Sequence, residues 1–174
     1  MAAMDGALAT TDVEDRPVDL TEIGPLVVRT LDLDDCPAMQ RLLGRCGTLR
    51  GATSVETIIR SLDWRPATAS TVTLGTIDIR GEHLVGLGGI VGDPRIEGAA
   101  RFGLVVDPAL RGHGVGRALL AELLRAAARV GYRSVRARTG DGNGAMQALA
   151  RRAGFTLQRT VGDEPVLLTR PLTA

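Results

Sequence analysis

A glycine-rich segment between an apolar run and an Ala/Leu-rich run constrains this chain more than any other part of its sequence. Residues 101–117 read RFGLVVDPALRGHGVGR, in which Leu104–Val106 predicts a buried strand that Asp107 and Pro108 end. Glycines then occupy every second position from Gly112 to Gly116, directly before a run that predicts a helix. The first backbone N–H groups of a helix have no internal partner, and glycine lets a ligand approach them closely. The segment therefore predicts an anion-binding loop, with a phosphorylated cofactor as its ligand.

Three phosphate-binding patterns compete for this loop. The G-x-x-x-x-G-K-[ST] pattern of nucleoside-triphosphate sites is excluded, because the chain contains no lysine. The dinucleotide pattern G-x-G-x-x-G does not match the G-x-G-x-G spacing, and the next expected strand, at 133–138, ends in arginine instead of an acidic residue. The pattern R-x-x-G-x-G is met by Arg111, Gly114 and Gly116.

With this pattern the sequence resembles the GNAT superfamily of acyl-CoA-dependent N-acetyltransferases, whose [QR]-x-x-G-x-[GA] segment holds the diphosphate of acetyl-CoA. Downstream, residues 143–149 (NGAMQAL) and 154–155 (GF) resemble the family's N-x-x-[AM]-x-x-L and GF segments. Upstream, residues 27–29 and 33–38 resemble its opening strand and first helix. The resemblance covers roughly residues 26–170.

The resemblance implies an α/β (α+β) fold: a GNAT-like mixed central sheet in which an antiparallel meander is followed by a βαβα unit, with helices on both faces. Residues 1–24 are small, polar and acidic and predict a flexible tail, whereas residues 25–174 predict a single GNAT-like domain. On the helix expected at 115–130, Glu122, Arg125 and Arg129 are predicted to face water. Strands are expected at 26–29, 71–79, 83–91, 99–106, 134–138, 155–159 and 166–169, and further helices after a cap at Asp34 or Asp35, at 53–62 and at 144–153.

The resemblance also implies an acetyl-CoA-dependent N-acetyltransferase, which moves the acetyl group to a primary amine by direct attack in a ternary complex. The edge of the strand before the loop would pair with the pantetheine arm, and a backbone N–H near Val106 would polarise the thioester carbonyl. Asn143, the only asparagine in the chain, fits a helix cap alone or a cap that also contacts the cofactor. The expected cofactor-binding residues are Leu104, Val105, Val106, Arg111, Gly112, His113, Gly114, Val115, Gly116, Arg117 and Asn143.

Two positions depart from the family pattern, and both concern catalysis. Many members carry a tyrosine as general acid where this chain has Ala150, and a glutamate base where it has Arg101, which cannot accept a proton. Glu97, Glu82 and His83 are the candidate replacements, although each also fits a solvated residue of a turn. The alternative function is a catalytically weak or inactive GNAT-fold module that binds CoA or an amine for regulation.

Composition limits the partners. A formal net charge of +1 and only four aromatic residues give no basis for nucleic-acid binding. No apolar run is long enough for a membrane span, no signal peptide is evident and two cysteines give no disulfide framework, so we expect a cytoplasmic protein. The expected partner is a small-molecule or peptide amine, with no bound metal, and the family offers a homodimer as an alternative to a monomer. The row Arg133, Arg136 and Arg138 fits either a solvated strand face or a site for acidic groups of a substrate.

Overall fold

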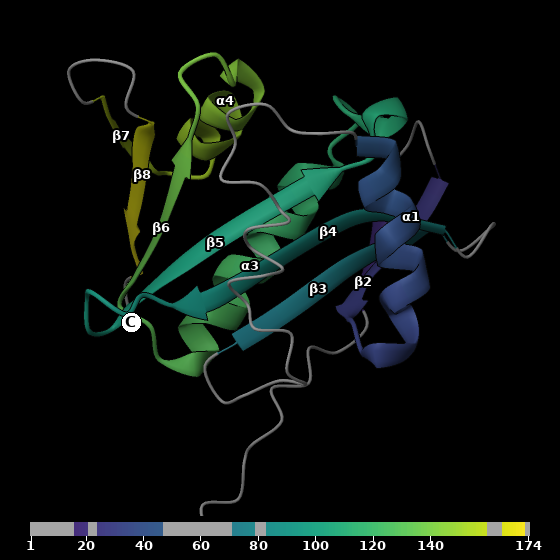
Figure 1. Ribbon diagram of the computed structural model, residues 1–174, viewed down its shortest axis with the longest axis horizontal. Coiled ribbons are helices and arrows are strands. Elements are labelled where there is room, and N and C mark those ends of the chain that lie inside the picture. The colour runs from purple at the N-terminus through teal and green to yellow at the C-terminus, as the bar shows by residue number, and fades with distance from the viewer. Residues whose placement is uncertain (1–15, 21–23, 47–70, 79–82, 160–164, 173–174) are drawn as a thin grey trace, which may run out of the picture.

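A mixed sheet forms the centre of the protein (Figure 1). The computed structural model describes residues 16–20, 24–46, 71–78, 83–159 and 165–172. Its strands are β1 (Arg16–Leu20), β2 (Gly24–Thr30), β3 (Thr71–Asp78), β4 (His83–Gly92), β5 (Ala99–Val106), β6 (Ser134–Thr139), β7 (Thr156–Gln158) and β8 (Val166–Pro171). The helices are α1 (Cys36–Cys46), α3 (Val115–Val130) and α4 (Gly144–Arg152), with 3₁₀ turns η1 (Leu33–Asp35) and η2 (Pro108–Leu110).

The strand order follows the chain for most of the sheet. Among the described residues the order is β1-β2-β3-β4-β5-β6-β8-β7. Every neighbouring pair is antiparallel except β5 and β6, which α3 connects as a parallel pair. The expected meander is therefore confirmed as β3–β5, and the expected βαβα unit as β5, α3, β6 and α4.

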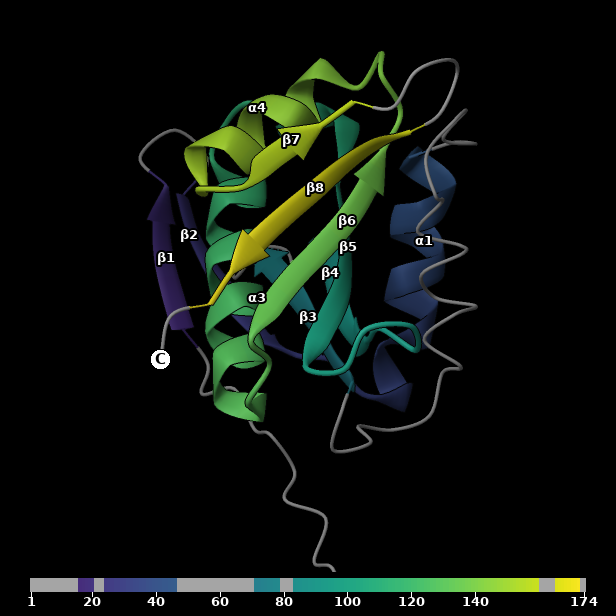
Figure 2. The same cartoon turned by 90° about the vertical axis from the view of Figure 1, so that its left-hand side faces the viewer.

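Helices cover both faces of the sheet, as expected (Figure 2). On one face, Leu119, Leu120 and Leu123 of α3 are almost fully buried against the sheet, in a core that also contains Ala150 of α4. On the opposite face, α1 packs Met39 and Leu42 into a smaller core with Leu31, Leu84, Leu87 and Val105. The apolar side chains that made these helices predictable are the ones that attach them to the sheet.

The structure departs from the expected flexible tail at residues 16–20. These residues form β1, which pairs with β2 from Arg16 opposite Val28 to Leu20 opposite Gly24. The sheet thus begins before the expected domain boundary, because backbone pairing at the edge of a sheet does not require an apolar side-chain pattern. The helix expected at 53–62 lies outside the described residues.

The prediction that Glu122 faces water is wrong. Glu122 is only 3% exposed, whereas its neighbour in the next turn, Arg125, is exposed. Arg125 Nε donates to Glu122 Oε2 at 3.1 Å, and a second guanidinium nitrogen contacts Oε1. The arginine thus neutralises the carboxylate, which permits its burial.

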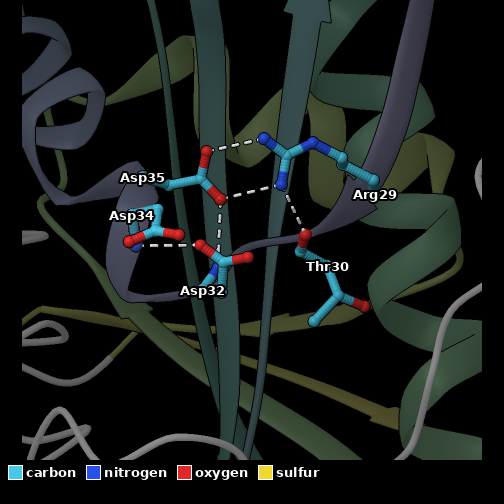
Figure 3. Close-up of polar contacts among 5 residues, drawn as sticks. All are labelled: Arg29, Thr30, Asp32, Asp34 and Asp35. Carbon is cyan, nitrogen blue, oxygen red and sulfur yellow. Dashed lines mark hydrogen bonds and ion pairs between the residues drawn. The ribbon is translucent and has the colours of Figure 1, made fainter.

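A polar turn connects β2 to α1 (Figure 3). Two guanidinium nitrogens of Arg29 lie 2.7 and 2.6 Å from the carboxylate oxygens of Asp35. The Asp32 carboxylate accepts from Asp34 N–H at 2.9 Å, and the Asp35 carboxylate accepts from Asp32 N–H at 3.0 Å. The hydrogen bond from Arg29 lowers the pKa of Asp35 despite its partial burial. The expected helix cap is therefore a wider network, in which Asp35 joins the end of β2 to the start of α1.

Candidate functional site

The glycine loop turns the chain from β5 into α3. The Asp107 carboxylate caps η2 by accepting from Ala109 N–H at 3.0 Å. Gly112 and Gly114 then have φ angles of 87° and 91°, in the left-handed region that strains residues with a Cβ. A Cβ on Gly112 would meet no heavy atom within 4 Å, so the loop borders open space there.

The N-terminus of α3 is open to an anion. Gly114 is its N-cap and provides no side-chain hydrogen bond, and the first turn contains no acidic residue. The N–H of Ala118 bonds to the oxygen of Gly114. The N–H groups of Val115, Gly116 and Arg117 therefore have no partner within the helix. Together with the helix dipole, these groups form the kind of site that binds a phosphate.

Basic side chains surround this helix start. Arg111 and Arg117 are exposed, and Arg111 Nε donates to the oxygen of Val106 at 3.3 Å. His113 Nδ1 lies 3.0 Å from the oxygen of Arg111. A Cβ on Gly116 would lie 3.4 Å from Val106 Cγ2, so the missing side chain brings α3 close to the end of β5. The loop thus presents backbone donors and cations at the end of one strand.

One edge of β5 is open beside the loop. The strands β5 and β6 pair only from Ala99 to Arg101 of β5 and then diverge, as Figure 1 shows. The bonds from Asp107 N–H to Val85 O and from Asp93 N–H to Ala99 O set the register with β4. The main-chain groups of odd-numbered residues of β5 consequently form hydrogen bonds with β4. Those of even-numbered residues point toward β6. Among the described residues, the main-chain groups of Leu104 and the N–H of Val106 thus have no strand partner at the divergence, while the oxygen of Val106 accepts from Arg111. Val105 is turned to β4 and packs its side chain under α1.

Asn143 lies at the start of α4, near the other side of this divergence. Its Oδ1 accepts a hydrogen bond from Met146 N–H at 3.1 Å, and the residue is exposed. The helix-cap part of the expectation is therefore confirmed. The side-chain NH₂ group remains available, because the cap uses only the oxygen.

Sequence reasoning missed a link between α1 and the glycine loop. Arg45 Nε donates to Asp107 Oδ2 at 2.6 Å, and Arg45 also bonds to the oxygen of Leu84 at 2.9 Å. The neighbouring Cys46 Sγ lies 3.7 Å from the oxygen of Val106. Burial raises the pKa of the Cys46 thiol, which favours the protonated form over a nucleophilic thiolate. No local signal relates Arg45 to Asp107, because 61 residues separate them along the chain.

The Arg45–Asp107 pair predicts a pH-dependent stability. Burial raises the pKa of Asp107, but the bond from Ala109 and the Arg45 guanidinium outweigh it, so the folded-state pKa is lowered. A lowered carboxyl pKa stabilises the fold above the unfolded-state pKa of about 3.9, and this contribution is lost as pH falls through the folded value. Asp107→Asn should therefore lose about 1–3 kcal/mol of unfolding free energy at pH 7, and the gap to the wild type should narrow below about pH 4.

Denaturant unfolding between pH 7 and pH 3 measures this gap. The matched control is Asp141→Asn, because Asp141 pairs with Arg159 at 3.3 Å but both side chains are 64% exposed. A gap for Asp107→Asn that stays constant over the whole pH range would contradict the prediction.

The expected catalytic residues are not gathered in one place. His83 begins β4 near the loop, whereas Glu97 lies in the turn before β5; both are exposed, and Glu82 lies outside the described residues. Since β5 has eight residues at a rise of about 3.3 Å each, His83 and Glu97 lie more than about 20 Å apart along the sheet and cannot serve one reacting atom together. Ala150 is fully buried and Arg101 is exposed, so neither position supplies a general acid or base.

A cavity of about 420 Å³ lies between α3, α4 and β8. Its apolar lining residues include Leu120, Leu124 and Leu149. Four arginines also line it: Arg117, Arg125, Arg152 and Arg170. Arg125 is paired with Glu122, and Arg170 donates to the oxygen of Ala153 at 2.6 Å. Because Arg117 belongs to the first turn of α3, this basic cavity extends from the glycine loop.

Neither a membrane-spanning helix nor a group of metal ligands is found in the part of the chain that the structure describes. No helix there has the length and apolarity that crossing a bilayer requires. No three His, Cys, Asp or Glu side chains in the described ranges are grouped as metal ligands.

Comparison with known proteins adds a family and a fold. Residues 37–155 match the model of the acetyltransferase (GNAT) family. No curated protein gives a significant sequence match.

Several solved structures have a similar fold. The GNAT domain of S. lividans PAT matches with a TM-score of 0.71 at 19% identity, over 91% of this chain and 97% of that one. A GNAT superfamily phosphinothricin acetyltransferase from Sinorhizobium meliloti, solved in complex with AcCoA, matches with a TM-score of 0.68 at 21% identity, over 84% of this chain and 88% of that one. Salmonella typhimurium yncA, solved with its cofactor acetyl-CoA, matches with a TM-score of 0.66 at 20% identity, over 84% of this chain and 92% of that one. At these identities the likeness establishes a shared fold.

Proposed function

This chain belongs to the GNAT acetyltransferase family, and we propose that it transfers an acetyl group from acetyl-CoA to a primary amine by direct attack in a ternary complex. The observation that carries the proposal is the open N-terminus of α3 beside the open edge of β5. The first binds a diphosphate and the second binds an extended, amide-containing chain, and acetyl-CoA contains both parts. Two solved structures of the same fold contain acetyl-CoA, which supports it as the donor here.

The donor would be held from its phosphates to its thioester. The N–H groups of residues 115–117 would bind the diphosphate, with charge-assisted contacts from Arg111 and Arg117. The basic cavity behind Arg117 would take the remaining charge of the nucleotide end through Arg152. Main-chain groups of Leu104 and Val106 would pair with the pantetheine arm, and the free amide of Asn143 would contact it from the opposite side of the divergence.

The chemical step needs little help from acidic or basic side chains. A CoA-like thiol has a pKa of about 8.5, so the thiolate can leave without the family's tyrosine. An amine attacks only when neutral, and an α-amine with a pKa near 7.8 is far more often neutral at pH 7 than a lysine amine near 10.4. A backbone N–H of the open edge near Val106 would stabilise the charge that develops on the thioester oxygen.

The direct test combines binding with turnover. Calorimetry with acetyl-CoA, CoA and NAD identifies the ligand of the loop, and a thiol-release assay over a library of primary amines detects transfer. We expect binding of acetyl-CoA and CoA but not NAD, and thiol release that requires an amine. Tight binding of acetyl-CoA without thiol release on any amine would instead support the regulatory module, which Ala150 and Arg101 favour.

A further inference from the structure

Three arginines of β5 and β6 lie on the sheet face opposite α3. Arg101 of β5 and Arg136 of β6 are register partners, and Arg138 lies two residues further along β6. Their sequence neighbours Ala100, Phe102 and Val135 are buried in the core beneath α3. Because side chains alternate along a strand, Arg101, Arg136 and Arg138 point to the other face. In Figure 1 this part of the sheet carries no described helix in front of it.

The charge on this face is largely unneutralised. Arg136 Nη1 lies 3.7 Å from Asp93 Oδ2, with its side chain 24% exposed. Among the described residues, Arg101 and Arg138 have neither an ion pair nor a side-chain hydrogen bond, and both are exposed. Like charges on adjacent positions of neighbouring strands are destabilising. A face used only for contact with water would gain from a mixture of charges, whereas this one keeps a positive pair side by side.

The arginines lie further along the path that the donor arm would follow from the glycine loop. The pair Arg101 and Arg136 is the last pairing of β5 with β6 before the strands diverge. Five residues of strand, about 16 Å, separate Arg101 from Val106 at the glycine loop. An extended arm that enters at the loop and follows the edge of β5 therefore runs toward this pair. The face opposite α3 is the side from which a second substrate can reach it, because α3 and its core fill the other side.

We propose that this arginine face binds the anionic group of the acceptor, which makes the acceptor a small amine that also bears a carboxylate or a phosphonate. The inference rests on the proposed transfer for its role, but the site itself stands on the arrangement of Arg101, Arg136 and Arg138. Planar guanidinium groups bind carboxylate and phosphonate oxygens in pairs, and both anions meet the same geometric requirement.

Matched ligand pairs test the site. The protein is saturated with CoA and titrated in a calorimeter with free amino acids and their carboxamides, and with 2-aminoethylphosphonate and ethanolamine. We expect the anionic member of at least one pair to bind at least about tenfold more tightly than its neutral partner, as a charged hydrogen-bonded pair predicts. The carboxylate and phosphonate series separate the two kinds of anion.

Single variants locate the effect. Arg101→Gln and Arg138→Gln should each reduce the anionic preference to less than about threefold. Arg129→Gln is the control, since it removes the same charge from the exposed end of α3. It should keep the preference, and all three variants should keep the wild-type affinity for acetyl-CoA. Thermal unfolding checks the fold, and we expect no loss of stability in Arg101→Gln because a repulsive neighbour is removed.

The outcomes separate this inference from the proposed function. Anionic and neutral partners that bind equally tightly would overturn the arginine site, and so would the absence of binding by any amine. A preference for the anionic partner that survives in Arg101→Gln and Arg138→Gln would also overturn it. Thiol release that is equally fast with neutral amines would also overturn it while supporting the transferase. An anionic preference that depends on Arg101 and Arg138, without thiol release from acetyl-CoA, would support the site and refute the transferase.

Discussion

Gly114→Asp is expected to abolish measurable binding of acetyl-CoA, a loss of at least about 100-fold in affinity. Gly114 is the N-cap of α3, with a φ of 91°. An aspartate there would place a carboxylate beside the three N–H groups that we expect to hold the diphosphate. The like charge would repel the ligand, and the carboxylate would compete for the same donors. Asp tolerates the left-handed region better than most residues and favours a helix start, so the protein should still fold.

Gly114→Asn separates charge from backbone strain. Asparagine has the size and the left-handed tolerance of aspartate but no charge. We expect it to lose about tenfold or less in affinity, with a thermal midpoint close to that of Gly114→Asp. Isothermal titration with acetyl-CoA and a thermal melt of each variant measure both quantities. If the two variants bind equally well and close to wild type, the diphosphate does not lie over Gly114.

The elements around the loop could be predicted because their signals are local. The apolar stripe of α3 and the glycines at its two ends predicted its extent of 115–130, and the structure has Val115–Val130. Gly131 ends the helix with a φ of 92°, which a residue with a Cβ rarely adopts. The meander β3–β5 was equally predictable, since alternating apolar residues and short turns determine both strand type and antiparallel pairing.

The contacts that position the loop depend on distant parts of the chain. The bond between Arg45 and Asp107 joins the end of α1 to the start of the loop, and neither residue stands out in its own segment. Glu122 was placed in water by its helical position, but Arg125 neutralises it and makes burial favourable. In both cases the partner of a polar side chain determines where that side chain lies, and the periodicity of the sequence does not identify the partner.

The candidate site also depends on pairing that the sequence does not encode locally. The motif predicted which residues surround the loop, but the open edge follows from the point at which β5 and β6 stop pairing. Only the register distinguishes Leu104 and Val106 from Val105, although the sequence presents the three as one apolar run. The same register places Arg101 beside Arg136, which turns an unexplained departure from the family pattern into a candidate for acceptor recognition.

The register makes a second strong prediction, for Val106→Pro. Val106 points its N–H to the open edge, so proline at this position removes no hydrogen bond of the sheet. The lost N–H is the expected donor to the thioester oxygen, and the pyrrolidine ring would also occupy space at that edge. We expect kcat/KM for thiol release to fall by at least about 100-fold. The thermal midpoint should remain close to that of Val106→Ala, which loses side-chain packing against the cluster of Leu26, Val85 and Val115 but keeps the N–H.

Val105→Pro provides the opposite control for the same register. The N–H of Val105 belongs to the ladder with β4, so its removal from the interior of the sheet should prevent stable folding. The three variants are compared by their rate of thiol release with the best amine of the assay. Circular dichroism of each variant shows whether it is folded. A folded Val106→Pro protein with the activity of Val106→Ala would show that the Val106 N–H takes no part in transfer. A folded and active Val105→Pro protein would contradict the register itself, and with it the open edge on which the donor site depends.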